Sequence, residues 1–261
     1  MNDTRDAAAL IPKGLIREGK LADARATLVA RVKAAPADTA ARLDLADVLI
    51  LLGEWEKADT HADLAGTNDP ARAITIALTR QLIRAAAWRD DCFTQGRPPE
   101  LVTEPDRAVA DALARIAGRT VEASEEDGSV LSGTCDGSPF DLLRDADDRT
   151  AGVLEVLTST GKYLWVPFGS IVALRPAKPE RLRDLVWRPA ELEVADGPGG
   201  MVYLPATYHA PTATDAQRMA RETDWIEQAD GSVTGVGARL LLIGDDLLPL
   251  DGFDELLGAR A

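Results

Sequence analysis

The sequence predicts an α+β protein of two domains: a tetratricopeptide-like α-solenoid over residues 1–127 and a smaller β-rich domain over residues 128–261. Two observations support this prediction. The first half repeats itself at an interval of 34 residues, with helix-sized segments between turns. In the second half, the helical period gives way to short apolar segments separated by Gly, Pro and Asp, a pattern typical of strands.

The repeat is visible in two segments of similar sequence. Gly19–Ala24 and Gly53–Ala58 are offset by 53 − 19 = 34 residues, and Pro36 and Pro70 keep the same offset. This period is typical of helix–turn–helix repeats of the tetratricopeptide type. Because one such unit cannot bury its apolar face alone, the units are expected to stack and to form a concave surface that holds a peptide or a helix.

The helices of the first half follow in order from this repeat. The first is expected over residues 4–18, either kinked at Pro12 or beginning there, since proline fits only the first turn of a helix. Asp38 is the expected N-cap of the third helix. The helices after the first are predicted over residues 21–34, 38–52, 54–67, 71–94 and 106–116.

The second half begins after an acidic, polar stretch, Glu122–Gly128, which we interpret as a frayed helix end or a linker. Thr160 and Gly161 fit a hairpin turn, and one helix is expected over residues 214–225. Seven strands are predicted, at Val130–Cys135, Val153–Thr158, Tyr163–Pro167, Ile171–Arg175, Leu192–Ala195, Met201–Pro205 and Leu240–Ile243.

Composition and charge exclude several classes of function. Hydrophobic residues make up 46% of the chain, enough for a core in each half. A net charge of −14 disfavours nucleic acid and anionic membranes, which would be repelled. The longest aliphatic runs are too short to cross a bilayer and no signal peptide is seen, so we expect a cytoplasmic protein. Cys92 and Cys135 lie far apart, which indicates free thiols in a reducing compartment.

The helical phase places six side chains on the concave side of the solenoid. They are Leu43, Asp47, Ile50, Ile74, Gln81 and Arg84. An amphipathic helix bound there would need apolar contacts at positions i, i+3 or i+4 and i+7, which the three aliphatic members could supply. The three polar members would then set its orientation. Each of the six could also be a packing residue or plain surface.

One acidic cluster offers an alternative based on chemistry. Its members are Asp141, Asp145, Asp147 and Asp148, beside Arg149. Close carboxylates can perform acid–base work or hold a divalent ion. Aspartates also cap turns and bond to their own backbone, and we favour turns and ion pairs here.

No other motif indicates catalysis. His61 and His209 are the only histidines, and they lie in different halves, so no histidine-based metal site or triad is supported. Gly197–Gly200 has glycines but neither the lysine nor the strand-to-helix context of a phosphate loop. We therefore expect no catalytic residue, no cofactor and no metal site.

Seven segments, spread in order over the second half, are the basis of a family resemblance. They are Gly137–Asp141, Asp145–Arg149, Val153–Glu155, Gly161–Phe168, Leu182–Ala190, Ala220–Trp225 and Gly235–Arg239. With them the chain resembles the ImpE/TagJ family, accessory proteins of bacterial type VI secretion systems. Two positions depart from the family pattern: Arg149–Gly152 lacks its Gly-Pro turn, and Thr207 stands where an arginine is expected.

The resemblance implies a tetratricopeptide-like α domain followed by a smaller α/β domain, and a non-enzymatic cytoplasmic function. Such a protein would bind the N-terminal helix of the small subunit of the contractile sheath. It would assist sheath assembly, or sheath recycling by the dedicated AAA+ unfoldase. Two alternatives stay open: an enzyme or metal-dependent site around Asp145–Arg149, and a structural oligomerisation module whose groove is filled by a neighbouring copy.

Overall fold

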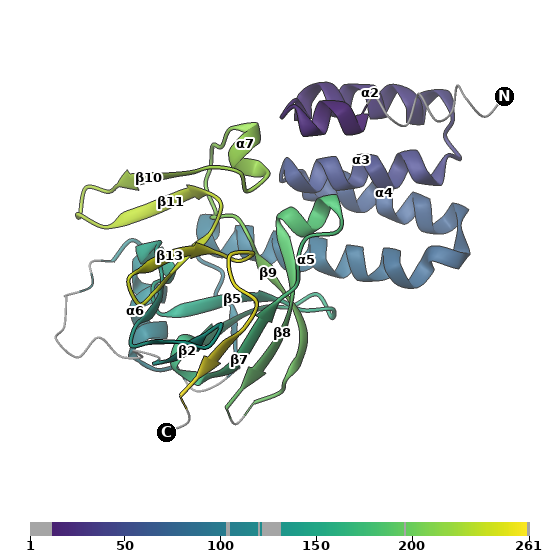
Figure 1. The fold of residues 1–261 in the computed structure, drawn as a ribbon. Helices are drawn as coiled ribbons and strands as arrows, with labels where there is room; N and C mark the ends of the chain where they lie inside the picture. Colours follow the sequence, from purple (N-terminus) through teal and green to yellow (C-terminus); the bar gives the residue numbers. More distant parts are fainter. Residues whose placement is uncertain (1–11, 103–104, 120, 122–131, 196, 260–261) are drawn as a thin grey trace.

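The computed structural model describes residues 12–102, 105–119, 121, 132–195 and 197–259. The protein is α+β: a helical first half is followed by a β-rich second half, as predicted (Figure 1). Within the described residues, no helix is both long and apolar enough to cross a membrane.

Helices follow the repeat closely. Residues 12–17 are helical. The next elements are α2 (Leu21–Ala34), α3 (Thr39–Leu51), α4 (Trp55–Asn68), the 3-10 turn η1 (Pro70–Arg72), α5 (Ala73–Gln95) and α6 (Arg107–Ile116). Pro12 is helical, but the chain before it lies outside the described residues, so the expected kink or start there stays a prediction.

The local signals for helix ends are confirmed. Asp38 caps α3, because its side chain accepts a hydrogen bond from the Ala41 N–H at 3.0 Å. The repeated Gly19 and Gly53 have φ of +75° and +72°, the left-handed conformation that ends a helix and that glycine adopts without strain. The 34-residue repeat therefore places a helix-ending glycine at the same position in both units.

Each helix from α2 to α5 packs against the next, and α5 runs on into the β-rich half (Figure 1). The side chains of Ala58, Ala62 and Ala65 on α4 are fully buried, and their small size lets the neighbouring helices approach closely. The tetratricopeptide-like character of this array stays a prediction from its repeat.

The described residues form three sheets, built from the second half together with the short strand β1 of the first half. All their pairings are antiparallel except that of β1 with β6. The largest has the order β1 (Glu100–Leu101), β6 (Tyr163–Pro167), β5 (Val153–Leu157), β9 (Gly200–Pro205), β8 (Trp187–Val194), β7 (Ile171–Pro176), β14 (Leu256–Gly258), β2 (Gly133–Cys135), β3 (Ser138–Phe140). The second has β13 (Asp246–Pro249), β12 (Leu240–Ile243) and β4 (Leu143–Asp145). The third is a ribbon of β10 (Thr223–Glu227) and β11 (Val233–Gly237).

The helix predicted over residues 214–225 is wrong for most of its length. A short helix, α7 (Asp215–Arg218), begins there with Thr214 as its cap. It stops because Ala220 has φ of +54°, outside the helical region, and the chain then enters β10. Pairing with β11 overrides the local pattern. Of the predicted strand Val130–Cys135, residues 130 and 131 lie outside the described residues.

One core joins the two halves. Leu45, Ile50 and Leu82 of the helices belong to the same buried cluster as Trp165 and Trp187 of the sheet. A second core lies within the β-rich half. The predicted domain boundary between residues 127 and 128, like the linker Glu122–Gly128, lies outside the described residues, and the division into two domains stays a prediction.

Candidate functional site

The helical array and the β-rich half meet along a seam formed by α3 and α5 on one side and by β5, β6, β8 and the 3-10 turn η4 (Leu182–Leu185) on the other. Arg183 of η4 fixes this contact. Its Nε lies 3.3 Å from Oδ1 of Asp47 on α3, and its Nη1 donates a hydrogen bond to Thr79 on α5. Burial raises the pKa of Asp47 to about 6, although the Arg183 charge acts in the opposite direction.

Three of the six predicted groove residues face this seam. Ile50 is 1% exposed and belongs to the joint core. Asp47 is paired with Arg183. Gln81 lies directly under the β5–β6 turn, where any side chain at Gly161 would clash with it. The side of the array that is predicted to be concave is therefore partly covered by the chain's own second half.

The other three predicted residues lie in different surroundings. Leu43 is half-buried against the small apolar cluster of α4 and α5. Ile74 is 88% exposed, and Arg84 is exposed at the edge of the seam. The structure thus places the six on no single open surface, and their part in binding stays a prediction.

Two cavities open on either side of η4. The first, called here the α2 cavity, has a volume of about 510 Å³. It is lined by Pro12, Lys13, Ile16, Arg17, Leu28, Asp44, Asp47, Glu180, Arg181, Leu182, Leu185 and Arg221. The second, the α5 cavity, has about 400 Å³ and is lined on its apolar side by Leu78, Leu82, Trp187, Met201 and Tyr203. Both are lined by apolar and charged side chains together.

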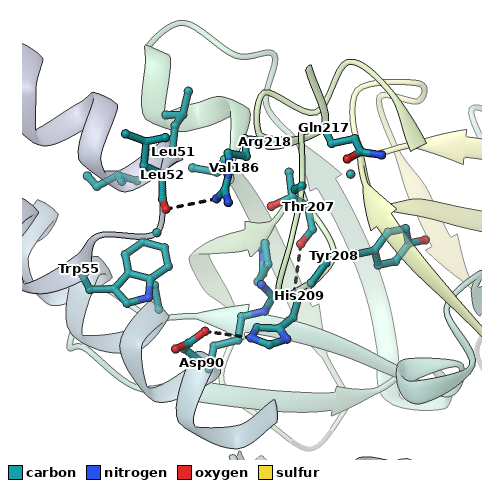
Figure 2. A pocket seen from close by; sticks show the side chains of 18 of the residues that line it. Leu51, Leu52, Trp55, Asp90, Val186, Thr207, Tyr208, His209, Gln217 and Arg218 are labelled. Carbon is teal, nitrogen blue, oxygen red and sulfur yellow. Dashed lines mark hydrogen bonds and ion pairs between the residues drawn. The ribbon is translucent and has the colours of Figure 1, made fainter. Parts of the chain in front are cut away.

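A third, smaller pocket of about 270 Å³ lies where α3 ends (Figure 2). Arg218 donates a hydrogen bond to the Leu52 carbonyl at 3.2 Å. Across the pocket, Nε2 of His209 lies 2.9 Å from Oδ1 of Asp90, and the two side chains point toward each other. Burial lowers the pKa of His209, while its hydrogen bond to Asp90 opposes the shift. His209, Asp90 and Arg218 therefore already have hydrogen-bond partners within the chain.

Beneath this pocket, a buried ionic network ties α5 to the sheets. Glu155, fully buried in β5, accepts hydrogen bonds from Arg89 Nε at 2.7 Å, from Arg239 and from the Tyr163 hydroxyl. Arg239 also lies 3.4 Å from Asp145. Burial raises the pKa of Asp145 to about 6, which the Arg239 charge opposes. These groups hold the seam together, because each buried charge has a partner of opposite sign.

Sequence analysis did not single out Glu155, Arg89 or Arg239. One signal was available: Glu155 interrupts an otherwise apolar run, Val153–Leu157, in which all five residues are buried. A charge at the centre of such a strand must have a partner. The partner could not be named, because Arg239 is 84 residues away in sequence.

The structure brings Asp145, Asp147, Asp148 and Arg149 together, as turn and ion-pair residues. Asp147 accepts hydrogen bonds from the Arg149 N–H and the Gly235 N–H, each at 2.9 Å. Asp148 pairs with Arg144 and accepts from the Val233 N–H. Asp141, the remaining member, is exposed. Within the described ranges, no group of three or more His, Cys, Asp or Glu residues could hold a metal ion.

Comparison with known proteins gives three findings. A family model described as ImpE protein matches residues 137–256. The type VI secretion system accessory component TagJ of Pseudomonas aeruginosa is 30% identical over 246 residues, which cover 90% of this chain and 86% of that protein. A Vibrio parahaemolyticus protein of known crystal structure has a TM-score of 0.86 at 27% identity, over 96% of this chain and 98% of that one.

Proposed function

The chain belongs to the family of the type VI secretion system accessory component TagJ, and from this premise we propose that it is an adaptor that binds the N-terminal helix of the small sheath subunit. In this proposal it acts in the cytoplasm without catalysis and assists sheath assembly, or recycling by the AAA+ unfoldase. Its helical array serves as a tetratricopeptide-like framework for the contact.

The α2 cavity is the observation that carries the proposal. Its floor is apolar, formed by Ile16, Leu28, Leu182 and Leu185. Its rim carries charges of both signs, at Lys13, Arg17, Asp44, Arg181 and Arg221. An amphipathic helix would insert apolar side chains spaced at i, i+3 or i+4 and i+7 into such a floor. The rim charges would then fix its direction.

The cavity also refines the predicted set of binding residues. Asp47 lines it, whereas Leu43, Ile50, Ile74, Gln81 and Arg84 do not. The helix would therefore bind beside η4, between η4 and the first helices, rather than along the middle of the concave side. Ile74 is exposed and does not line the cavity. A substitution there therefore distinguishes binding along the predicted groove from binding in the α2 cavity.

A pull-down with the small sheath subunit, intact and without its first helix, tests the proposal. We expect the intact subunit alone to be retained; equal recovery of both forms would refute helix capture. Ile16→Glu, inside the α2 cavity, should abolish retention, whereas Ile74→Glu should leave it unchanged. Loss of binding in Ile74→Glu alone would instead assign the contact to the first turn of α5. Thermal melts of both variants show whether each is folded.

A further inference from the structure

The β10–β11 ribbon has one covered edge and one open edge. On the β11 side, the Val233 and Gly235 N–H groups donate to Asp148 and Asp147, and the Gly237 carbonyl accepts from the Tyr208 N–H at 2.8 Å. Among the described residues, β10 has no strand partner besides β11. In Figure 1 the ribbon lies at the margin of the molecule with β10 on its outer side.

The register shows which backbone groups of β10 are free. At the two ends of the ribbon, the Ala238 N–H donates to the Glu222 carbonyl at 2.9 Å and the Gln228 N–H to the Ser232 carbonyl at 2.7 Å. In an antiparallel pair, alternate residues bond to the partner strand and those between them point outward. The outward N–H and C=O groups are therefore those of Thr223, Trp225 and Glu227. A row of this kind is a template for another strand.

The strand at this edge carries two large apolar side chains at the surface. Trp225 is 40% exposed and Ile226 is 49% exposed, and they are two of the few large apolar side chains at the surface of the described residues. The Trp225 ring rests on Tyr208, with the ring centres 5.7 Å apart, so it is held in place. Edges are ordinarily blunted with charged side chains, lysine above all, or with proline. The ribbon carries no lysine or proline, and its charged side chains are all acidic.

Charge selects the kind of partner. Glu222, Asp224, Glu227 and Asp230 follow one another along β10 and its turn, all exposed, and no Lys or Arg lies between Glu222 and Gly237. Pairing with the same strand of a second copy would bring two such acidic rows together, which is unfavourable. A strand that carries basic side chains would be attracted instead.

We propose that β10 is a docking edge for an extended basic segment of another protein, which adds to the ribbon as a third strand. Its backbone bonds to Thr223, Trp225 and Glu227. Apolar side chains on one face of the added strand pack on Trp225, and lysines or arginines on its other face lie beside Glu222 and Asp224. None of Thr223, Trp225 and Glu227 lines the α2 cavity, although Arg221 on the rim of that cavity directly precedes Glu222.

Fluorescence anisotropy with labelled peptides tests this on the full chain. The probe is a short peptide of alternating lysine and valine, and its control is the same peptide with alternate amides N-methylated, which keeps the charge but removes the bonding edge. We expect the methylated peptide to bind about tenfold more weakly or worse. Equal binding of the two peptides would show attraction by charge alone and would overturn the proposal.

Two variants of Glu227 distinguish the contribution of backbone hydrogen bonds from that of charge. The Glu227 N–H points away from β11, so Glu227→Pro blocks the open edge without removing a bond of the ribbon, and Glu227→Gln removes only the charge. Probe binding should fall about tenfold further in the proline variant than in the glutamine variant. Equal affinities in two variants with wild-type circular dichroism would contradict strand addition. A dimer in sedimentation that Glu227→Pro abolishes would assign the edge to a second copy and also overturn the proposal.

Discussion

The helical array and the seam both have buried interiors, but these are built from different kinds of side chain. Between α3 and α5, the buried residues of α4 are alanines at 0% exposure, with no charge among them. In the seam, Glu155, Asp145 and Arg239 are equally buried and all ionisable. The array is held by the close packing of small side chains, whereas the seam adds buried ion pairs to its apolar core. The two should therefore respond differently to substitution, because a lost methyl group leaves a cavity whereas a lost partner leaves a charge.

The largest effect is expected from Arg239→Met. Removing this guanidinium leaves Asp145 without its partner and Glu155 with one cation fewer, both out of reach of water. The free energy of unfolding in urea should fall by about 3–5 kcal/mol. Arg239→Lys keeps the charge but not the planar fork, and should cost less. A loss below about 1 kcal/mol in the methionine variant, the range of exposed ion pairs, would contradict the view that pairing holds the seam.

Overpacking tests whether the helical array depends on the close packing of its small side chains. Ala62 on α4 is fully buried, so Ala62→Leu must push α4 away from its neighbours and should cost about 1–3 kcal/mol. Ala71 is exposed in the turn before α5, and Ala71→Leu should change stability by less than about 0.5 kcal/mol. Chemical unfolding of the two variants under the same conditions gives both values. Similar losses would mean that close helix packing is not what this array depends on.

The same contrast explains what the sequence could predict. Gly19, Gly53 and Asp38 act on neighbours a few residues away, so the helix ends could be located within a residue or two. The strands β6 and β12 were located correctly because their aliphatic and aromatic runs are short and bounded by turns. Local pattern is sufficient where the structure depends on local contacts.

The predictions failed where the structure depends on contacts between residues that are far apart in the sequence. The helix predicted to reach residue 225 was wrong because the chain leaves the helical conformation at Ala220, and the strand that follows depends on its pairing with β11. Asp47 and Ile50 were assigned to the concave side, but the phase of a helix does not show what covers it, and η4 lies more than 100 residues further along the chain. The α2 cavity exists only because η4 fills part of that side, so no periodicity could have indicated it.

Asp47 gives a prediction that depends on pH. Its pKa is about 6 in the folded protein against 3.8 in the unfolded chain, so between these values the folded state binds more protons. Its contribution to stability is therefore present below about pH 4 and is lost as the pH rises through 6. The free energy of unfolding of the wild type, minus that of Asp47→Asn, should fall by about 2 kcal/mol from pH 4 to pH 7. Urea titrations across that range measure it; a difference that grows with pH would show that the Arg183 charge outweighs burial.

The smallest loss of stability is expected from a substitution of Arg80. Like Arg239 it pairs with two carboxylates, but it is partly exposed rather than buried. Arg80 on α5 binds Asp59 on α4 at 2.7 and 2.9 Å and also pairs with Asp63, and all three side chains are at least a third exposed. Arg80→Met should cost about 0.5–1 kcal/mol, and 1 M salt should remove most of that loss by screening. The penalty of Arg239→Met should stay unchanged in the same salt, because buried pairs are not reached by ions. If Arg80→Met cost more than about 2 kcal/mol, or if salt reduced both penalties equally, burial would not be what separates the two arginines.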